Sequence, residues 1–568
     1  MKTPAAGLQV FRDAGRELAG PALLAELRAA LEALPDARGP RRGRLALDAL
    51  LRAGELECGL ADLAAAGSDA AAGVGAAAAA RITDAFADAL VGDRDPLAPV
   101  PLDLGDIHPP AILRVGRPEG FAYYALHPLD LSRLADSLSI ASGAVGVIGV
   151  RTIGTTLSAV VAAALRRRGL AASRLTVRPG GHPWDRRLDL APAERRRVHG
   201  WIASGDELLV VDEGPGLSGS TFLSVGEALV AEGASPDRIT FLCTGAPDPD
   251  RLTAPDAPRR ARRFRWRAVS GPTQIPPDAG TFVGGGAWRR ILCPDASRWP
   301  PCWPTFERLK YLSLDGRRLH KFEGLCHHGV EVQERVRLLA DAGFGPPPRD
   351  EGDGFLSYPI LSGRPLASAD LSRDVLDFLA DYCAFRAAEI PALPPDDLLE
   401  AALHDNLAAL ELAHPPGLSL AVERPVIPDA RMMPHELLGA PAGVLLKVDA
   451  GSHGDDHFLP GPTDIAWDLA AAIVEWRMDA AARLYLLQRY HRASGDHAAP
   501  RLHPYIVAYA ASRLALTRMA EGALRGSDEA PRLVRDLDRY RAVLDAELQL
   551  PAAPRSRPPP APPGRFSG

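Results

Sequence analysis

The segment Leu208–Thr221, with the sequence LLVVDEGPGLSGST, combines an apolar run, two adjacent acids and a glycine-rich loop. The apolar run is typical of a strand, and the small residues before Thr221 lead into a helical pattern. Glycines let the backbone curl so that several N–H groups converge on one anion, and a helix start adds positive charge. Asp212 and Glu213 would repel a phosphate but suit a diol, because a carboxylate accepts hydroxyl hydrogen bonds. The order therefore predicts a site for a phosphorylated ribose.

Short apolar runs alternate with helical patterns on both sides of this segment. Helical spacing covers Leu157–Arg168 and Phe222–Glu232. Strands alternating with helices favour a parallel sheet that is covered on both faces, so the predicted fold class is α/β. The strands are predicted at Ala144–Val150, Leu175–Val177, Glu207–Val211 and Ile239–Cys243.

Two other phosphate-binding loops are excluded by the order of the residues. The segment lacks the Gly-Lys-Ser/Thr ending of a P-loop nucleotidase. A dinucleotide-binding loop would have its acid about 20 residues after the glycines, whereas here the acids come first. A glycine-rich turn that binds no ligand is the remaining alternative.

The segment resembles the phosphoribosyl-pyrophosphate loop of type I phosphoribosyltransferases: four apolar residues, two acids, then a small-residue loop closing in Thr. The resemblance implies a type I phosphoribosyltransferase-like fold in which Asp212 and Glu213 are catalytic and hold the ribose 2′ and 3′ hydroxyls. It also implies phosphoribosyl pyrophosphate (PRPP) as substrate and Mg²⁺ as cofactor. The family has one residue fewer before the final stretch, and Gly214-Pro215-Gly216 absorbs the difference. The phosphate-binding residues implied are Gly216, Ser218, Gly219, Ser220 and Thr221.

Three further segments fit this resemblance. Arg151–Thr156 (RTIGTT) follows the strand at Ala144–Val150, where the family places its pyrophosphate-binding loop. Arg178–Arg197 is polar and basic, like the mobile loop that closes over the reacting centre, and Pro118–Asp130 resembles a hood over the acceptor. The loop chemistry is also similar to that of phosphoribosyltransferases of bacterial stress operons, including tellurite-resistance systems. The pyrophosphate ligands implied are Arg151, Thr152, Gly154, Thr155 and Thr156.

A second resemblance covers roughly residues 309–491 and concerns the aminoglycoside phosphotransferase and choline kinase group. These are small-molecule kinases with a protein-kinase-like α+β fold. Lys321 (RLHKFEG) follows a strand-turn-strand pattern and Glu334 lies on the next predicted helix. The resemblance implies that this pair positions ATP phosphates. Phe355–Leu366 resembles the hinge strand, and DIAWDLA at Asp464–Ala470 resembles the structural sequence after the metal-binding acid.

Three residues of this unit take the places of catalytic groups. Asp449, at the end of VLLKVD, stands at the position of a metal ligand. Asp429, in PDARMMPHELL, stands at the catalytic base, and His435 stands where an asparagine metal ligand is expected. The usual His-Gly-Asp opening is missing, and Mg²⁺ prefers oxygen ligands to imidazole. An active kinase and a nucleotide-binding pseudokinase therefore both remain open.

Composition limits the classes of partner. The chain has 568 residues, a net charge of −6 and 24% charged residues, which argues against a general nucleic-acid binder. Its six cysteines form no CxxC pair, so buried thiols are favoured over a disulfide scaffold or a zinc site at Cys293 and Cys302. The chain lacks an apolar run of about 18 residues and an apolar start, which predicts no membrane span and a cytoplasmic location. Small-molecule substrates are expected, and oligomerisation remains open.

Five regions are predicted along the chain. An enzyme with both activities is the leading interpretation; a sugar-phosphate sensor without turnover and a scaffold that uses its N-terminal helices are the alternatives. Neither the acceptor of the phosphoribosyl group nor a phosphoryl acceptor follows from the sequence. The regions are a helical region at 1–98, a phosphoribosyltransferase-like domain at 99–247, an irregular linker or cap at 248–304, a kinase-like domain at 305–550 and a disordered Pro-rich tail at 551–568.

Overall fold

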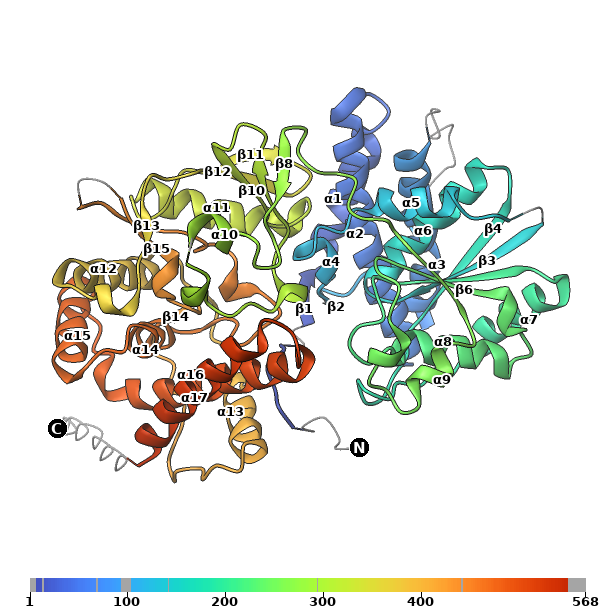
Figure 1. Ribbon diagram of the computed structural model, residues 1–568. Helices are drawn as coiled ribbons and strands as arrows, with labels where there is room; N and C mark the ends of the chain where they lie inside the picture. Colours follow the sequence, from blue (N-terminus) through green and yellow to red (C-terminus); the bar gives the residue numbers. More distant parts are fainter. Residues whose placement is uncertain are drawn as a thin grey trace, which may run out of the picture.

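A computed structural model describes residues 7–12, 15–67, 70–92, 104–140, 143–293, 295–440 and 443–549. The predicted Pro-rich tail at 551–568 lies outside the described residues. Figure 1 shows two units side by side: a parallel sheet with its covering helices at the right, and a second sheet-and-helix unit at the left. The N-terminal helices α1 and α2 lie between them.

The first unit is built on a five-stranded parallel sheet with the order β4-β3-β5-β6-β7. Three strands have the predicted bounds, and β4 begins four residues earlier than the prediction of Leu175, at Ala171. The α/β prediction with a parallel sheet is therefore confirmed. The strands are β3 (Ala144–Val150), β4 (Ala171–Val177), β5 (Glu207–Val211), β6 (Ile239–Cys243) and β7 (Arg265–Ala268).

Helices cover both faces of this sheet because its strands are apolar on both sides. Val147 and Val211 pack into one core with the N-terminal helices, and Ile148 and Val210 pack into a second core on the other face. The first face is covered by α2 (Gly39–Ala65), α3 (Ala70–Val91), α5 (Pro128–Asp136) and α6 (Ile153–Arg167). The second is covered by α7 (Pro192–Ser204), α8 (Ser220–Ala231) and α9 (Ala257–Ala261).

Two regional predictions need correction. The region 1–98 is not purely helical, because β1 (Gly15–Ala19) pairs antiparallel with β2 (Ile112–Gly116). The region 248–304 is not simply a linker, because β7 is the outer strand of the parallel sheet and β8 (Ala279–Phe282) joins the next sheet. Strand β7 alternates exposed arginines with half-buried residues, and this short, half-polar pattern gives little sequence signal for a strand.

The C-terminal unit begins with a five-stranded antiparallel sheet of order β11-β12-β10-β9-β8, followed by mostly helical structure. The predicted strand-turn-strand is formed by β9 (Lys310–Ser313) and β10 (Arg318–Phe322), and α11 (His327–Asp341) follows. The remaining strands are β11 (Arg349–Gly352), β12 (Phe355–Pro359), β13 (Arg364–Pro365), β14 (Pro425–Val426), β15 (Leu437–Gly439), β16 (Leu445–Lys447) and β17 (Thr463–Asp464). The helices are α12 (Arg373–Glu389), α13 (Leu398–Ala409), α14 (Ala466–Glu475), α15 (Ala480–Ser494), α16 (Ala499–Ala523) and α17 (Ala530–Leu548).

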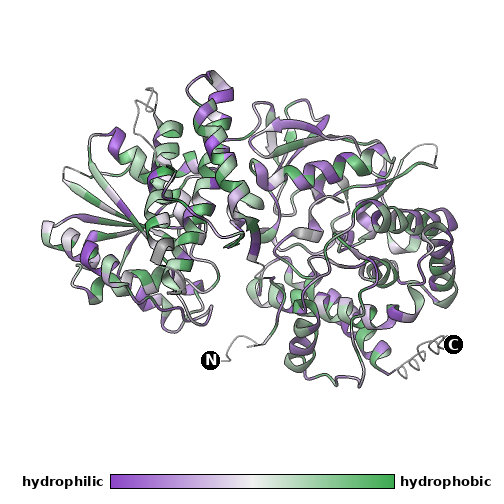
Figure 2. Cartoon of the chain, turned by 180° about the vertical axis from the view of Figure 1, so that it is seen from behind, coloured by the Kyte–Doolittle hydropathy of each residue, from purple (hydrophilic) through white to green (hydrophobic). Residues whose placement is uncertain are grey.

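The two units share one continuous core. Phe322, Leu325 and Phe355 of the C-terminal unit pack in the same apolar cluster as the N-terminal helices. In Figure 2 the long helices carry both hydrophobic and hydrophilic residues, as expected of helices with one packed side. Among the described residues, no helix is at once long and apolar enough to cross a membrane. The remaining α-helices are α1 (Gly20–Ala33), α4 (Glu119–Ala122) and α10 (Arg289–Leu292).

Candidate active site

The two predicted phosphate loops follow adjacent strands of the parallel sheet. Strand β3 leads into the Arg151 loop and α6, and strand β5 leads into the Asp212 loop and α8. Helices α6 and α8 lie on opposite faces, and β4 and β6 lie on opposite sides of the β3–β5 pair. The strand order therefore reverses between β3 and β5, and the loops diverge at their carboxyl ends. Such a switch point is where open α/β sheets bind ligands.

The backbones of these two loops approach closely at Gly154. A Cβ atom added there would lie 2.5 Å from the carbonyl oxygen of Val211, so only glycine fits beside the start of the acid pair. Just before it, Thr152 has φ 97° and ψ −104°, a conformation that a β-branched residue rarely adopts. Strain of this kind costs on the order of 1–3 kcal/mol and tends to occur at binding and active sites.

The two acids follow the end of β5 and are half-buried. Glu213 accepts a hydrogen bond from the backbone N–H of Gly120 at 2.9 Å, and the Asp212 carboxylate accepts one from the N–H of Glu213 at 2.9 Å. Burial raises the pKa of Asp212 to about 7. Burial, together with Glu119 and Asp212, raises the pKa of Glu213 to about 8. A carboxyl group whose pKa is raised this far, next to a glycine-rich loop that could bind an anion, is characteristic of functional sites.

The phosphate loop is covered by the tip of the basic loop that follows β4. The Ser218 and Ser220 hydroxyls donate hydrogen bonds to the carbonyl oxygen of Pro183, at 3.0 and 2.7 Å. Helix α8 begins directly after Gly219, which has φ 73°. Gly216 also has positive φ, and Thr221 lies half-buried in the first turn of α8. A phosphate at this loop would compete with the Pro183 carbonyl for both serine hydroxyls.

Three predicted pyrophosphate ligands are placed differently from the expectation. The Arg151 guanidinium donates to Glu194 at 3.0 Å and to the Thr176 carbonyl at 3.2 Å, so its charge is engaged within the protein. Thr155 and Thr156 are buried, because α6 begins at Ile153 and turns both side chains into the protein. Thr156 packs so closely against α2 that a Cβ on Gly54 would lie 2.0 Å from its hydroxyl oxygen. The hydroxyls of Thr155 and Thr156 are therefore not directed toward a ligand in front of this helix start.

Two arginines of the basic loop carry charge near the candidate site. Arg178 lies 3.4 Å from the Thr152 hydroxyl and pairs with Asp62. Arg178 and Arg186 both lower the pKa of Asp212 against the larger effect of burial, which places their charges near the acid pair. The basic character of Arg178–Arg197 was the available sequence signal, although it did not single out these two residues.

The predicted hood over the acceptor bridges the two units. Its Gly120 contacts Glu213, as described above, and its Tyr124 hydroxyl lies 2.7 Å from His457 Nε2 in the C-terminal unit. His457 in turn pairs with Asp456, and Arg308 donates to the Ala122 carbonyl at 3.1 Å. The hood is thus held against the phosphate-loop acids by contacts from both sides.

In the C-terminal unit, Lys321 and Asp449 come together although they are far apart in sequence. The Lys321 ammonium contacts the Asp449 carboxylate, Glu323 at 2.9 Å and the Ser452 hydroxyl at 3.1 Å. Burial alone would raise the pKa of Asp449, but two lysines and His453 hold it well below its ordinary value. The second lysine is Lys310, 3.5 Å from Asp449, which sequence reasoning missed.

The predicted partner of Lys321 is not where the resemblance placed it. Glu334 is exposed on α11, and the neighbouring Arg335 instead points inward to the Gly451 carbonyl. Glu323, two residues after Lys321 and just past the end of β10, supplies the carboxylate. Side chains two residues apart in an extended segment point to the same side, so the spacing of Lys321 and Glu323 was a sequence signal for this contact.

Asp429 is enclosed rather than open to a substrate. It is fully buried, accepts a hydrogen bond from the Tyr382 hydroxyl at 2.7 Å, and pairs with Lys447 at 3.2 Å. Its other oxygen accepts from the Met432 N–H at 3.2 Å. Burial would raise the pKa of Asp429, but Lys447 and Arg386 outweigh burial and lower it. A catalytic base must reach the hydroxyl that it deprotonates. In this conformation both carboxylate oxygens of Asp429 are bound by groups of the protein itself.

The two predicted metal ligands, Asp449 and His435, have different neighbours in the structure. His435 stacks on Trp288 with ring centroids 5.6 Å apart, and burial lowers its pKa. The imidazole that approaches Asp449 is His453, at 3.5 Å, and it also belongs to a buried group with Asp429 and Glu436.

Comparisons with known proteins find similarity in structure alone. No protein-family model matches the chain, and no curated protein matches it. A choline/ethanolamine kinase family protein from Mesorhizobium loti is similar with 15% identity and a TM-score of 0.32, over 42% of this chain and 88% of that one. Choline kinase LicA from Streptococcus pneumoniae is similar with 17% identity and a TM-score of 0.28, over 42% of this chain and 89% of that one. A GDP complex of aminoglycoside 2′-phosphotransferase-IIIa is similar with 15% identity and a TM-score of 0.30, over 45% of this chain and 95% of that one. At these identities and TM-scores the likeness identifies neither an activity nor a substrate for this chain.

Proposed function

We propose that the N-terminal unit transfers ribose 5-phosphate from phosphoribosyl pyrophosphate to a small-molecule acceptor. The observation that carries the proposal is the acid pair Asp212–Glu213, set at the switch point of a parallel sheet. On one side it adjoins the anion-binding loop that opens α8, and on the other the strained loop that opens α6. A diol, a 5′-phosphate and a pyrophosphate on one small molecule match these three features.

In the reaction, the bond between ribose C1 and pyrophosphate breaks, a bond from C1 to the acceptor forms, and the acceptor loses a proton. The acid pair would accept hydrogen bonds from the ribose hydroxyls, and the loop before α8 would hold the 5′-phosphate through its N–H groups and serine hydroxyls. Arg178 and Arg186 would balance charge on the leaving pyrophosphate. Mg²⁺ prefers oxygen ligands, so Asp212 and Glu213 suit it, and a bound ion would neutralise pyrophosphate charge.

Calorimetry with phosphoribosyl pyrophosphate and Mg²⁺ tests the site. The double variant Asp212→Asn/Glu213→Gln should bind more weakly by on the order of 1.5–3 kcal/mol for each charged hydrogen bond lost. Glu207→Gln is the matched control, because Glu207 lies at the opposite end of β5, and it should bind like the wild type. Unchanged affinity in a folded double variant would show that the ribose is not held by this pair.

Pyrophosphate release separates an enzyme from a sensor. If the unit only senses the sugar phosphate, ligand binds but no pyrophosphate appears when candidate bases are added. The raised pKa values of the acids and the enclosing hood favour turnover, because a sensor has no need of a site that excludes water.

For the C-terminal unit, we propose nucleotide binding without efficient phosphoryl transfer. The convergence of Lys321 and Asp449 supports a site for phosphates and Mg²⁺. The enclosed, lysine-paired Asp429 argues against a working catalytic base. This proposal keeps the kinase-like interpretation for the fold and favours the pseudokinase alternative for the chemistry.

Thermal melts with and without Mg-ATP test this second proposal. A ligand that binds only the folded state raises the melting temperature by mass action, so millimolar Mg-ATP should raise it for the wild type. Lys321→Ala and Asp449→Asn should each remove most of that increase. Glu334→Gln, an exposed change on α11, should retain it. If Mg-ATP does not change the melting temperature of the wild-type protein, the C-terminal unit does not bind the nucleotide.

A further inference from the structure

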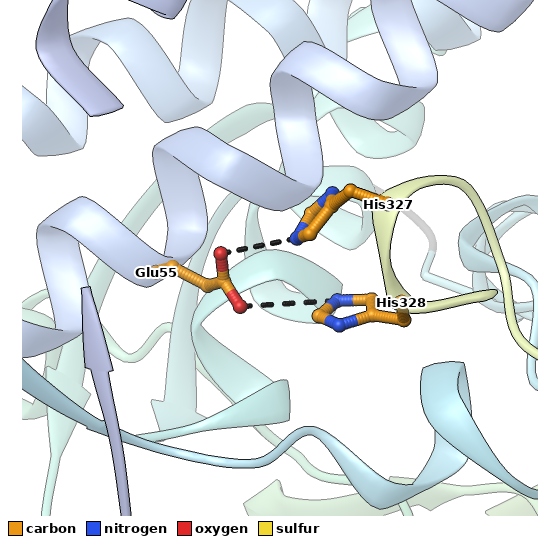
Figure 3. Close-up of side chains that lie close together, drawn as sticks. All are labelled: Glu55, His327 and His328. Atoms are coloured by element: carbon orange, nitrogen blue, oxygen red, sulfur yellow. Dashed lines mark hydrogen bonds and ion pairs between the residues drawn. The ribbon is translucent and has the colours of Figure 1, made fainter. Parts of the chain in front are cut away.

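Two histidines and a glutamate meet where the N-terminal helices contact the C-terminal unit (Figure 3). Glu55 extends from α2, and His327 and His328 are the first two residues of α11. His327 Nε2 lies 3.1 Å from one Glu55 oxygen, and His328 Nε2 lies 3.9 Å from the other. One atom from each of the three side chains falls within 4.8 Å of the others. These separations are close to those between the ligands of a single metal ion.

The cluster is buried and contains an unsatisfied nitrogen. The side chains of Glu55, His327 and His328 are 8%, 9% and 2% exposed. His328 Nε2 has no hydrogen-bond partner among the described residues. A buried nitrogen of this kind is costly unless it bonds to something, and a metal ion would satisfy it.

The groups around the cluster resemble the outer shell of a metal site. Asp48 lies 3.0 Å from His327 Nδ1, so it orients that ring with Nε2 toward Glu55. Metal-binding histidines commonly contact a carboxylate through their second nitrogen in this way. Arg16 donates to Glu55 at 2.5 Å, as an outer hydrogen bond to a ligating carboxylate would. Arg16 and Arg52 oppose an added cation, and the carboxylates of Asp48 and Glu55 offset them.

A small cavity borders the cluster on the side of the α6 loop. Its volume is about 10 Å³, roughly the space for one water-sized occupant, and its lining includes Glu55, His328, Cys58, Thr152 and Thr156. A three-ligand site next to such a space has room for a fourth, exchangeable ligand. The same cavity reaches the strained Thr152, so occupancy of the cluster adjoins the candidate pyrophosphate loop.

We propose that Glu55, His327 and His328 bind one zinc ion that joins α2 to α11. Two imidazoles and one carboxylate suit Zn²⁺, which binds nitrogen and oxygen at about 2.0–2.2 Å in tetrahedral geometry. Mg²⁺ and Ca²⁺ prefer sets made of oxygen alone. The ion takes the place of the proton that His327 shares with Glu55, and water in the cavity completes the coordination. The site ties the candidate transferase loop to the C-terminal unit.

Titration of the metal-free full-length protein with Zn²⁺, and with Co²⁺ as a visible probe, tests the proposal. One equivalent should bind, Co²⁺ should give the strong visible absorption of a tetrahedral site, and Zn²⁺ should raise the melting temperature. His328→Gln should remove the tetrahedral absorption and weaken Zn²⁺ binding by at least 100-fold. Asp48→Asn, which leaves the ligands in place, should weaken it by roughly 10–100-fold.

Two rival clusters serve as controls. His320 lies with Asp278 and Glu351, and His453 lies with Asp429 and Glu436. His320→Gln and His453→Gln should each bind Zn²⁺ like the wild type. The proposal fails if the wild type binds no Zn²⁺, or if one of these variants loses the ion while His328→Gln keeps it. Circular dichroism of each variant identifies any that does not fold. If His328→Gln does not fold, the Zn²⁺ affinity of Asp48→Asn decides whether the proposal holds.

Discussion

The double variant Asp212→Asn/Glu213→Gln is expected to be more stable than the wild type at pH 8 and to lose phosphoribosyl transfer. Both residues are half-buried, and burial outweighs the opposing charges of Arg178 and Arg186 at Asp212, so the ionised forms are disfavoured in the folded protein. An amide has nearly the same shape and carries no charge. Its oxygen can still accept the N–H of Gly120 or of Glu213, so the local fold should persist.

The gain should depend on pH in a defined direction. The ordinary pKa values of the two groups are 3.8 and 4.5, and in the folded protein they rise to about 7 and about 8. Between those limits the folded protein binds more protons than the unfolded chain, so wild-type stability falls as the pH rises. The stability difference should be absent below about pH 4 and greatest above pH 8. Each pKa unit corresponds to about 1.4 kcal/mol, so shifts of about three units correspond to at most about 4–5 kcal/mol per carboxyl group.

Urea denaturation of both proteins from pH 4 to pH 9 measures this difference, and pyrophosphate release measures activity. Asp429→Asn provides the contrast, because that acid is paired with Lys447 and its neutralisation should destabilise the protein. We therefore expect opposite signs for the two acids and a greater loss of activity for Asp212→Asn. Equal stability of the double variant and the wild type at every pH would mean that the acids are solvated and carry ordinary pKa values.

The strands that face two helical layers were predictable from the sequence. Strands β3, β5 and β6 are short apolar runs bounded by polar or glycine-rich segments, and their bounds agree with the prediction. Strand β4 was predicted only from Leu175, because AASR at its start lacks the β-branched residues that favour strands. Its first residues form a strand because β3 pairs with them, which is tertiary information.

The candidate site also has some features that could be predicted from the local sequence and others that depend on tertiary packing. The acid pair and the glycine loop carry local chemistry, so their roles could be proposed from residue types and order. The side-chain directions of Thr155 and Thr156 depend on where α6 begins, and that start depends on its packing against α2. The contact of Ser218 with Pro183 joins loops 35 residues apart, and a single sequence carries no signal for such a pair.

The C-terminal unit shows why position within a resemblance does not establish a role. Asp429 occupies the place of a catalytic base, yet the residue that decides its chemistry is Lys447, on a strand after the loop. The resemblance gave no expectation for a lysine there. A buried cation can only be recognised once the fold has brought it to the acid that it neutralises.

Replacing Lys447 with Met is expected to cost about 3–5 kcal/mol of folding free energy, because it leaves two buried carboxylates without their cation. The Lys447 ammonium lies 3.2 Å from Asp429 and 2.9 Å from Glu436, and its side chain is only 2% exposed. Burial alone would lower the pKa of Lys447, but Asp429 and Glu436 outweigh it and raise that pKa, so the lysine is charged. Methionine fills a similar volume without the charge.

Urea denaturation of Lys447→Met, alone and combined with Asp429→Asn, measures how strongly the two residues are coupled. The second change removes one of the stranded carboxylates, so the double variant should recover part of the lost stability. Arg525→Met is the control in the same unit, because its exposed pair with Glu521 should contribute little. If Lys447→Met costs less than about 1 kcal/mol, the carboxylate does not depend on the lysine and water must reach it. Asp429 would then be accessible enough to act as a base, and the C-terminal unit would have to be reconsidered as a working phosphotransferase.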